Sequence, residues 1–154
     1  MNKLIALSLS VLFLNAVHGQ DPALEMQIKE LKKIKPKEIV FRDATRVKPL
    51  LIANKKAVSK YFEKEDVAKR LKSIDFKKQV LFVFAWRGSG QDEMSYTLKK
   101  DTSDESNAGE VEFTYRPGRT RDLRPHTKVY AIKDGVLWNG KTVRPAKRDS
   151  TGSK

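Results

Sequence analysis

The sequence predicts an α+β fold, with short helices in its N-terminal half and a mostly antiparallel sheet of five to seven strands, or a small sandwich, after them. Hydrophobic residues at helical spacing occur before residue 75, and strand-like segments separated by turn residues fill the chain after it. Segregated helices and sequential strands are typical of an α+β domain.

Residues 1–19 have the pattern of a secretory signal peptide. Lys3 precedes an apolar run over residues 4–14, which is shorter than the roughly 20 residues that a membrane-spanning helix needs. Val17 and Gly19 are small residues at the two positions that signal peptidases read, so cleavage after Gly19 is expected. We therefore expect an exported protein, periplasmic or extracellular, with no stable membrane span.

Composition excludes several kinds of site. The 154 residues include 32 Lys and Arg, 19 Asp and Glu, two His and no Cys, with a net charge of +13. Disulfides, thiolate nucleophiles, cysteine-based zinc sites and iron–sulfur clusters are therefore impossible. Removal of the signal peptide leaves a net charge of +12 and one histidine, His126. The length suits one domain, over residues 37–144, and the positive charge indicates an anionic partner or surface.

The segment 20–36 is predicted to form an amphipathic helical arm that ends at Pro36, because Leu24, Ile28, Leu31 and Ile34 have helical spacing. This arm either packs on the domain or extends from it.

Residues 38–41 (EIVF) and 47–52 are two β-prone runs, and Pro49 makes the second an edge strand or an irregular segment. Asn54 is a suitable cap for a helix that extends to Phe62. A second short helical segment is expected over residues 66–74.

The strongest strand is the apolar run at residues 79–86, which indicates a buried central strand. A glycine-rich loop at 87–93 follows it, and residues 94–98 are the expected return strand. Residues 101–109 form an acidic exposed loop, 111–115 a strand, 116–126 a long polar loop and 128–132 another strand. Asn139 and Gly140 predict a hairpin, and residues 145–154 are a disordered basic tail.

The glycine-rich loop is the first candidate site, with Arg87, Ser89, Gln91 and Asp92 as its polar residues. Backbone N–H groups of such a loop can bind an anion, although the sequence lacks the Lys-Ser/Thr pair of a P-loop. A hairpin turn that needs a positive φ at a glycine explains the same residues without a ligand.

The loop at 116–126 is the second candidate. Arg116, Arg119, Arg121 and Arg124 lie within nine residues and precede His126. Arginine suits bidentate binding of phosphate, sulfate or carboxylate. A solvated basic loop, with Asp122 as an internal partner, is the alternative explanation.

Catalysis and metal binding have weaker support. Ser89, Asp92 and His126 are the residue types of a hydrolase triad, but their spacing does not indicate one. The acidic residues Asp101, Asp104 and Glu105 lack the spacing of a calcium loop. We expect no cofactor and no metal.

The stretch 74–138 resembles a known family. It contains IDF at 74–76, a buried strand, a glycine-rich turn, a return strand and RPH before a later strand. This arrangement resembles the C-terminal β-domain of PrcB-type protease-complex subunits. The strings GSGQD and GRTRDLR also resemble small exported planctomycete proteins. The first resemblance implies an accessory or inhibitory role that operates through protein–protein contact.

These patterns lead to three functional hypotheses. The first is a non-enzymatic exported domain that engages a protein partner through the loops 87–93 and 116–126, which meet if their strands run in the same direction. The second is a polyanion-binding protein of the envelope or matrix, and the third is a hydrolase. Nucleic acid would bind by charge alone, but it is not the expected target of an exported protein.

Overall fold

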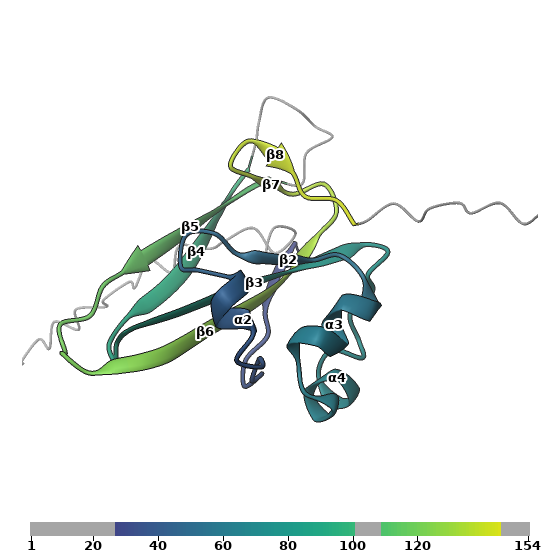
Figure 1. The fold of residues 1–154 in the computed structure, drawn as a ribbon. Coiled ribbons are helices and arrows are strands. Elements are labelled where there is room, and N and C mark those ends of the chain that lie inside the picture. Colours follow the sequence, from purple (N-terminus) through teal and green to yellow (C-terminus); the bar gives the residue numbers. More distant parts are fainter. Residues whose placement is uncertain (1–26, 101–108, 146–154) are drawn as a thin grey trace, which may run out of the picture.

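Two four-stranded sheets and three short helices make up the computed structural model, which describes residues 27–100 and 109–145 (Figure 1). The strands are β1 (Ile28–Glu30), β2 (Leu50–Ile52), β3 (Gln79–Ser89), β4 (Glu93–Lys99), β5 (Glu110–Arg116), β6 (Leu123–Lys133), β7 (Leu137–Trp138) and β8 (Lys141–Thr142). The helices are α2 (Val40–Asp43), α3 (Lys55–Tyr61) and α4 (Lys64–Lys69). The predicted α+β class is confirmed.

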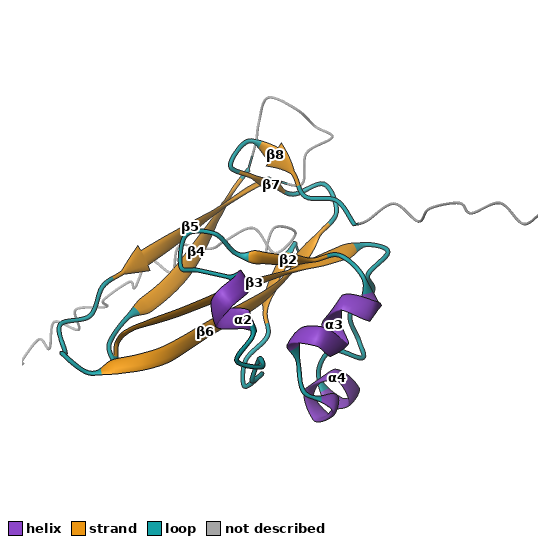
Figure 2. Ribbon diagram, viewed as in Figure 1, coloured by secondary structure: helices purple, strands orange, loops and turns teal. Residues whose placement is uncertain are grey.

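The two sheets have the strand orders β1-β6-β3-β2 and β4-β5-β7-β8 (Figure 2). Every pairing is antiparallel except that of β5 with β7. The predicted return strand β4 does not pair with β3, because the chain passes after β3 into the second sheet, where β4 pairs with β5. The sandwich alternative is therefore the architecture that forms.

Strand β3 lies inside its sheet and is buried on both faces, which explains its continuous apolar run. Leu81, Val83 and Ala85 point toward the helices, and their neighbours in the cluster include residues of α2 and α3. Phe82 and Phe84 point toward the second sheet. The prediction of a central strand is confirmed, although the strand continues three residues past the expected end, to Ser89.

Aromatic side chains fill the space between the sheets. The ring of Phe113 lies 4.7 Å from that of Phe84 and 5.0 Å from that of Tyr130, between ring centroids. The ring of Trp138 meets that of Phe82 edge-on at 5.0 Å. Such contacts add specific geometry to apolar burial, so this cluster fixes how one sheet lies on the other.

The predicted cap of α3 is confirmed, since the Asn54 side chain accepts the backbone N–H of Ala57 at 2.9 Å. Helix α4 lies over 64–69, earlier than the predicted segment 66–74. Leu71, within the predicted segment, is buried, but it lies beyond the helix end.

The helix predicted over the arm is wrong for the described residues. Ile28 to Glu30 form β1, which pairs with β6 and buries Ile28 between the sheets. A short segment with apolar Ile28, exposed Lys29 and half-buried Glu30 fits a strand as well as a helix, and pairing with the edge of β6 decides the outcome. Residues 20–26 of the arm lie outside the described residues.

Residues 38–41 are also not a strand. Val40 begins the single-turn helix α2 and is fully buried against the helix-side face of the first sheet. Pro49, by contrast, has the predicted effect, because β2 begins directly after it and lies at the edge of the sheet.

The predicted loop 116–126 is shorter than expected, since Arg124, Pro125 and His126 belong to β6 and pair with β3. The backbone oxygen of Val129 accepts the N–H of Leu31, so the backbone groups of Val129 point to the side of β6 that faces away from β3. Backbone groups alternate in direction along a strand, so the nitrogen of Pro125 faces that same side. No ladder bond to β3 is therefore lost, which is how a proline is tolerated in a strand.

The predicted hairpin at Asn139 and Gly140 joins β7 to β8, and both residues have positive φ, 50° and 69°. This is the backbone that a tight hairpin turn requires. No helix among residues 27–100 and 109–145 has the length and apolar character needed to cross a membrane. The predicted signal peptide, most of the predicted acidic loop and the residues from 146 onward lie outside the described residues.

Candidate binding surface at the loop end

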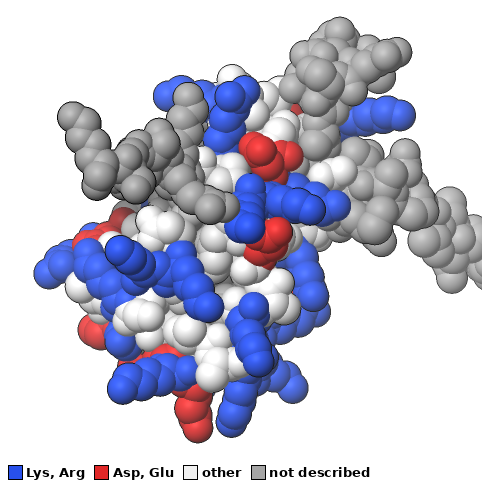
Figure 3. Space-filling view, turned by 90° about the vertical axis from the view of Figure 1, so that its right-hand side faces the viewer, with Lys and Arg blue, Asp and Glu red and all other residues white. Residues whose placement is uncertain are grey.

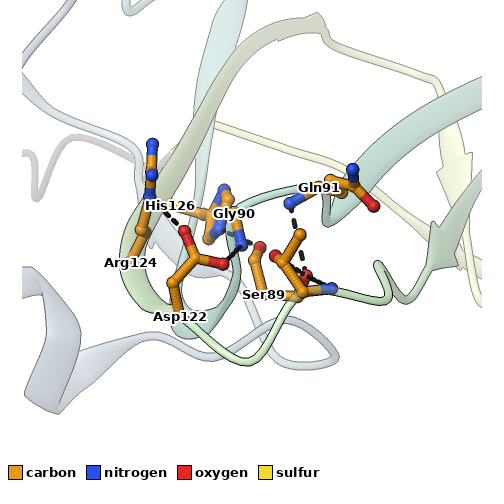
Figure 4. A network of polar contacts seen from close by, with 7 residues as sticks. Ser89, Gly90, Gln91, Asp122, Arg124 and His126 are labelled. Atoms are coloured by element: carbon orange, nitrogen blue, oxygen red, sulfur yellow. Dashed lines mark hydrogen bonds and ion pairs between the residues drawn. The ribbon is translucent and has the colours of Figure 1, made fainter.

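The turn between β3 and β4 meets the loop between β5 and β6 at one end of the sandwich (Figure 4). The Oγ atoms of Ser89 and Thr120 are 2.6 Å apart, and the backbone N–H of Gly90 donates to Asp122 Oδ1 at 3.0 Å. The predicted convergence of the two loops is confirmed. We call residues 88–93 and 116–122 together the loop end.

Asp92 makes hydrogen bonds that connect the two loops of the loop end. Its Oδ1 accepts the backbone N–H of Gly118 at 2.8 Å, and its Oδ2 accepts Trp86 Nε1 at 3.0 Å and the Tyr115 hydroxyl at 2.9 Å. These donors, led by the Gly118 N–H, lower the pKa of Asp92 against the opposing effect of burial. Burial and the neighbouring Asp92 raise the pKa of Tyr115. Asp92 is therefore held as a carboxylate that binds both loops.

Glycines allow this close approach. A Cβ atom on Gly88 would lie 2.0 Å from Asp92 Oδ2, and one on Gly118 would lie 2.6 Å from the backbone carbon of Gln91. The expectation of a positive φ in the glycine-rich turn is wrong, since the described glycines with positive φ are Gly109, Gly135 and Gly140. Gly88 therefore leaves room for the Asp92 carboxylate, and Gly118 allows the second loop to lie against Gln91.

His126 packs under the turn. Its Nε2 lies 2.7 Å from the backbone oxygen of Ser89, to which it donates, and its ring stacks on Trp86 at 5.1 Å with an interplanar angle of 11°. Ser89 Oγ accepts the backbone N–H of Thr120 at 3.0 Å. Among the described residues, no hydrogen bond joins Ser89 Oγ to His126 or His126 to Asp92. The three residues share a cluster without the hydrogen bonds of a triad.

Three of the candidate arginines are paired with carboxylates. Arg87 binds Glu38 and lies over the Phe41 ring, with its Cζ 5.1 Å from the ring centroid. Arg116 binds Glu93 across the β4–β5 pair, and Arg124 binds Asp122. All three side chains are exposed, and such ion pairs contribute little to stability.

Arg119 and Arg121 differ from these three. Both are exposed, and neither has a carboxylate within 4.0 Å among the described residues. Nearby, the Thr120 hydroxyl, the Gly90 N–H and Arg124 lower the pKa of Asp122 to about 2. Asp122 is thus directed to other groups, and the two arginines remain available.

A shallow pocket of about 910 Å³ opens at the loop end. Its walls combine backbone and small residues of both loops with the side chains of Gln91, Glu93, Arg116 and Arg119. Arg116 is already paired with Glu93 there, so Arg119 is the lining arginine without a carboxylate partner among the described residues.

Arg46 also belongs to this end of the molecule, and no motif in the sequence indicates it. Its guanidinium carbon lies 4.8 Å from the centroid of the Tyr115 ring, within the range of a cation–π contact. The contact joins residues 69 positions apart, from the α2–β2 connection and β5. Only the sandwich arrangement brings Arg46 to the candidate surface.

The described residues contain no group of three His, Asp or Glu side chains that is suited to a metal ion. The acidic residues Asp101, Asp104 and Glu105 lie outside the described residues.

Comparison with models of protein families, with curated proteins and with solved structures finds no match to this chain.

Proposed function

We propose that this protein is an exported, non-enzymatic binding domain whose loop end engages an acidic segment of a protein partner. The observation that carries the proposal is the pair Arg119 and Arg121, which is exposed and without a carboxylate partner in the described residues, on a loop that Asp92 fixes in place. Arginine side chains bind carboxylates with two parallel hydrogen bonds, so an acidic peptide satisfies them.

Preorganisation supports a role in recognition. Binding is weakened by the entropy lost when a loop becomes ordered, and a loop that is already fixed avoids part of this loss. Hydrogen bonds from Gly118 to Asp92 and from Gly90 to Asp122 fix the loop here. The pocket beside Arg119 presents both polar backbone and a guanidinium group, which suits an extended peptide better than a compact small molecule.

Export rests on the signal-peptide pattern of residues 1–19, and the expected partner is therefore a protein of the envelope or the exterior. A polyanionic polymer is the competing partner at this surface. It differs in its salt dependence, because polymer binding is dominated by the release of counterions and weakens steeply as salt rises.

A retention experiment tests the proposal. The purified protein is immobilised and exposed to the envelope fraction of its own cells at 50 and at 300 mM NaCl. We compare the wild type with Arg119→Gln/Arg121→Gln and with Lys29→Gln/Lys32→Gln, a control with the same change in charge at two exposed positions outside the loop end. Retention of a defined protein by the wild type and the control, but not by the arginine variant, is expected.

Equal retention by all three proteins would place the contact elsewhere. Retention that disappears entirely at 300 mM NaCl, together with recovery of polymer instead of protein, would favour the competing polyanion.

A further inference from the structure

A second basic surface lies on the side of the molecule that carries α3 and α4, at the opposite end of the fold from the loop end (Figure 1). Residues 55–78 contain eight lysines and one arginine against four acidic residues. Figure 3 views the side of the molecule on which α3 and α4 lie in Figure 1, and basic side chains cover more of it than acidic ones. The lysines that are close in the sequence are thus also gathered on one surface of the molecule. We call residues 55–78 the lysine face.

Burial of the apolar side of the helices places the lysines outward. Val58 and Tyr61 of α3 and Leu71 after α4 pack into the cluster on the helix-side face of the first sheet. Ala57 and Val67 pack partly against the same cluster, and the lysines of these short elements lie on the exposed side. The lysines there without an ion pair among the described residues are all exposed: Lys55, Lys56, Lys64, Lys72, Lys77 and Lys78.

Fold stability does not account for two of these lysines. Lys55 and Lys56 occupy the first turn of α3, and no acidic residue is present in that turn. A cation there opposes the helix dipole, so both positions disfavour the helix they belong to. A residue that conflicts with its local structure without compensation is more often explained by function than by folding.

Two hollows cross this surface side by side. One, of about 550 Å³, is lined by Lys55, Phe76 and Lys77, and the other, of about 500 Å³, by Lys78, Lys133 and Asp134. Asp75 borders both, so they are adjacent. Its Oδ1 accepts the backbone N–H of Lys77 at 3.0 Å, and Asp75 itself is exposed. The lysines thus follow a path on which an extended chain can lie.

We propose that the lysine face binds a linear polymer with closely spaced phosphate groups, independently of the protein partner at the loop end. Lysine ammonium groups act as point charges that need no planar, bidentate ligand, so they suit a flexible polymer of high charge density. The two ends of the fold then bind two different partners. The arginines of the loop end bind a carboxylate-bearing protein, and the lysines of the lysine face bind a phosphate-bearing polymer.

A bilayer is the less suitable occupant. Peripheral attachment to lipid normally combines basic residues with apolar side chains that enter the interface. The large hydrophobic side chains that are exposed in the described residues are Val47, Leu51 and Leu123, and none belongs to the lysine face. Charge complementarity without an insertable apolar side chain therefore favours a soluble polymer.

Titration with long-chain sodium polyphosphate tests the proposal. The wild type is compared with Lys55→Gln/Lys56→Gln/Lys72→Gln/Lys77→Gln and with the control Lys29→Gln/Lys32→Gln/Lys48→Gln/Lys100→Gln, in which four exposed lysines outside the face are removed. We expect the face variant to bind at least about tenfold more weakly than the control. Four phosphate contacts also predict that wild-type affinity falls about 50-fold from 50 to 200 mM NaCl.

Three results would overturn the proposal. An equal loss in both variants would mean that net charge alone drives binding. Unchanged affinity in the face variant would place the polymer elsewhere. Binding to phosphatidylglycerol vesicles without binding to polyphosphate would make lipid the partner. Thermal unfolding of each variant confirms that the fold is intact, and the exposed positions of the substitutions make this the expected outcome.

Discussion

The backbone N–H of Gly118 donates to Asp92 Oδ1 at 2.8 Å, and this bond joins two connections that lie 26 residues apart in sequence. One connection leaves the first sheet after β3, and the other returns to it before β6. Asp92 also holds Trp86 and Tyr115, one from each sheet. The loop end is therefore the place where the two sheets are fastened together, and a change at this joint affects both stability and the candidate surface.

Gly118→Ala is expected to destabilise the protein by about 1–3 kcal/mol, the usual cost of overpacking. The new Cβ would lie 2.6 Å from the backbone carbon of Gln91, which cannot move without displacing the turn. Gly90→Ala is the milder comparison, because its Cβ would meet side-chain atoms of Asp122 and Arg124 and no backbone atom. Urea unfolding measures both, and a larger loss in Gly90→Ala would contradict the account.

Stability is expected to fall as the pH drops from about 4 to 2. The folded pKa of Asp122 is about 2 and that of Asp92 is lowered, both below the value of about 3.9 for unfolded aspartate. The unfolded state therefore binds more protons in this range, and stability is lost as pH falls. Unfolding curves at several pH values measure the slope. Asp122→Asn should make it shallower, and an unchanged slope would refute the assignment.

Phe82→Ala is expected to cost about 3–5 kcal/mol, because it removes a buried ring at the centre of the aromatic cluster. The exposed Leu123, which is 79% accessible, provides the control, and Leu123→Ala should change stability by less than about 0.5 kcal/mol. Chemical denaturation of the two variants, followed by circular dichroism, compares them. Similar losses would mean that the sheets are not held by this cluster.

Much of the fold follows from local patterns in the sequence. The apolar run at 79–86 predicts the central strand, Asn54 predicts the start of α3, and the Asn139–Gly140 pair predicts its hairpin. In each of these cases one local property, either continuous hydrophobicity, a capping side chain or a residue tolerant of positive φ, decides the structure alone.

The predictions are wrong where contacts between distant parts of the chain determine the secondary structure. Ile28 fits either a helix or a strand until the edge of β6 pairs with it. The arginine segment resembles a loop because Pro125 interrupts it, yet that proline faces the open side of β6, where no bond is lost. Neither the partner strand nor the open side is visible in a local pattern.

The sequence predicts the two loops of the candidate surface, but it does not predict the hydrogen bonds through which Asp92 connects them. Asp92 and the arginines are evident in the sequence as polar residues near glycines, whereas the convergence of Trp86, Tyr115 and Gly118 on Asp92 depends on the crossing between sheets. Arg46 enters only through its contact with Tyr115. Long-range arrangement, which has no local signal, supplies this part of the site.

The most direct test of the central claim is an NMR titration of the protein with a hexaglutamate peptide, which represents an acidic protein segment. We expect the largest amide shifts at Gly90, Gln91 and residues 118–121, and their loss in Arg119→Gln/Arg121→Gln. Amides of the loop end that do not move, while those of α3 and α4 do, would contradict the claim that the loop end is the surface for an acidic partner.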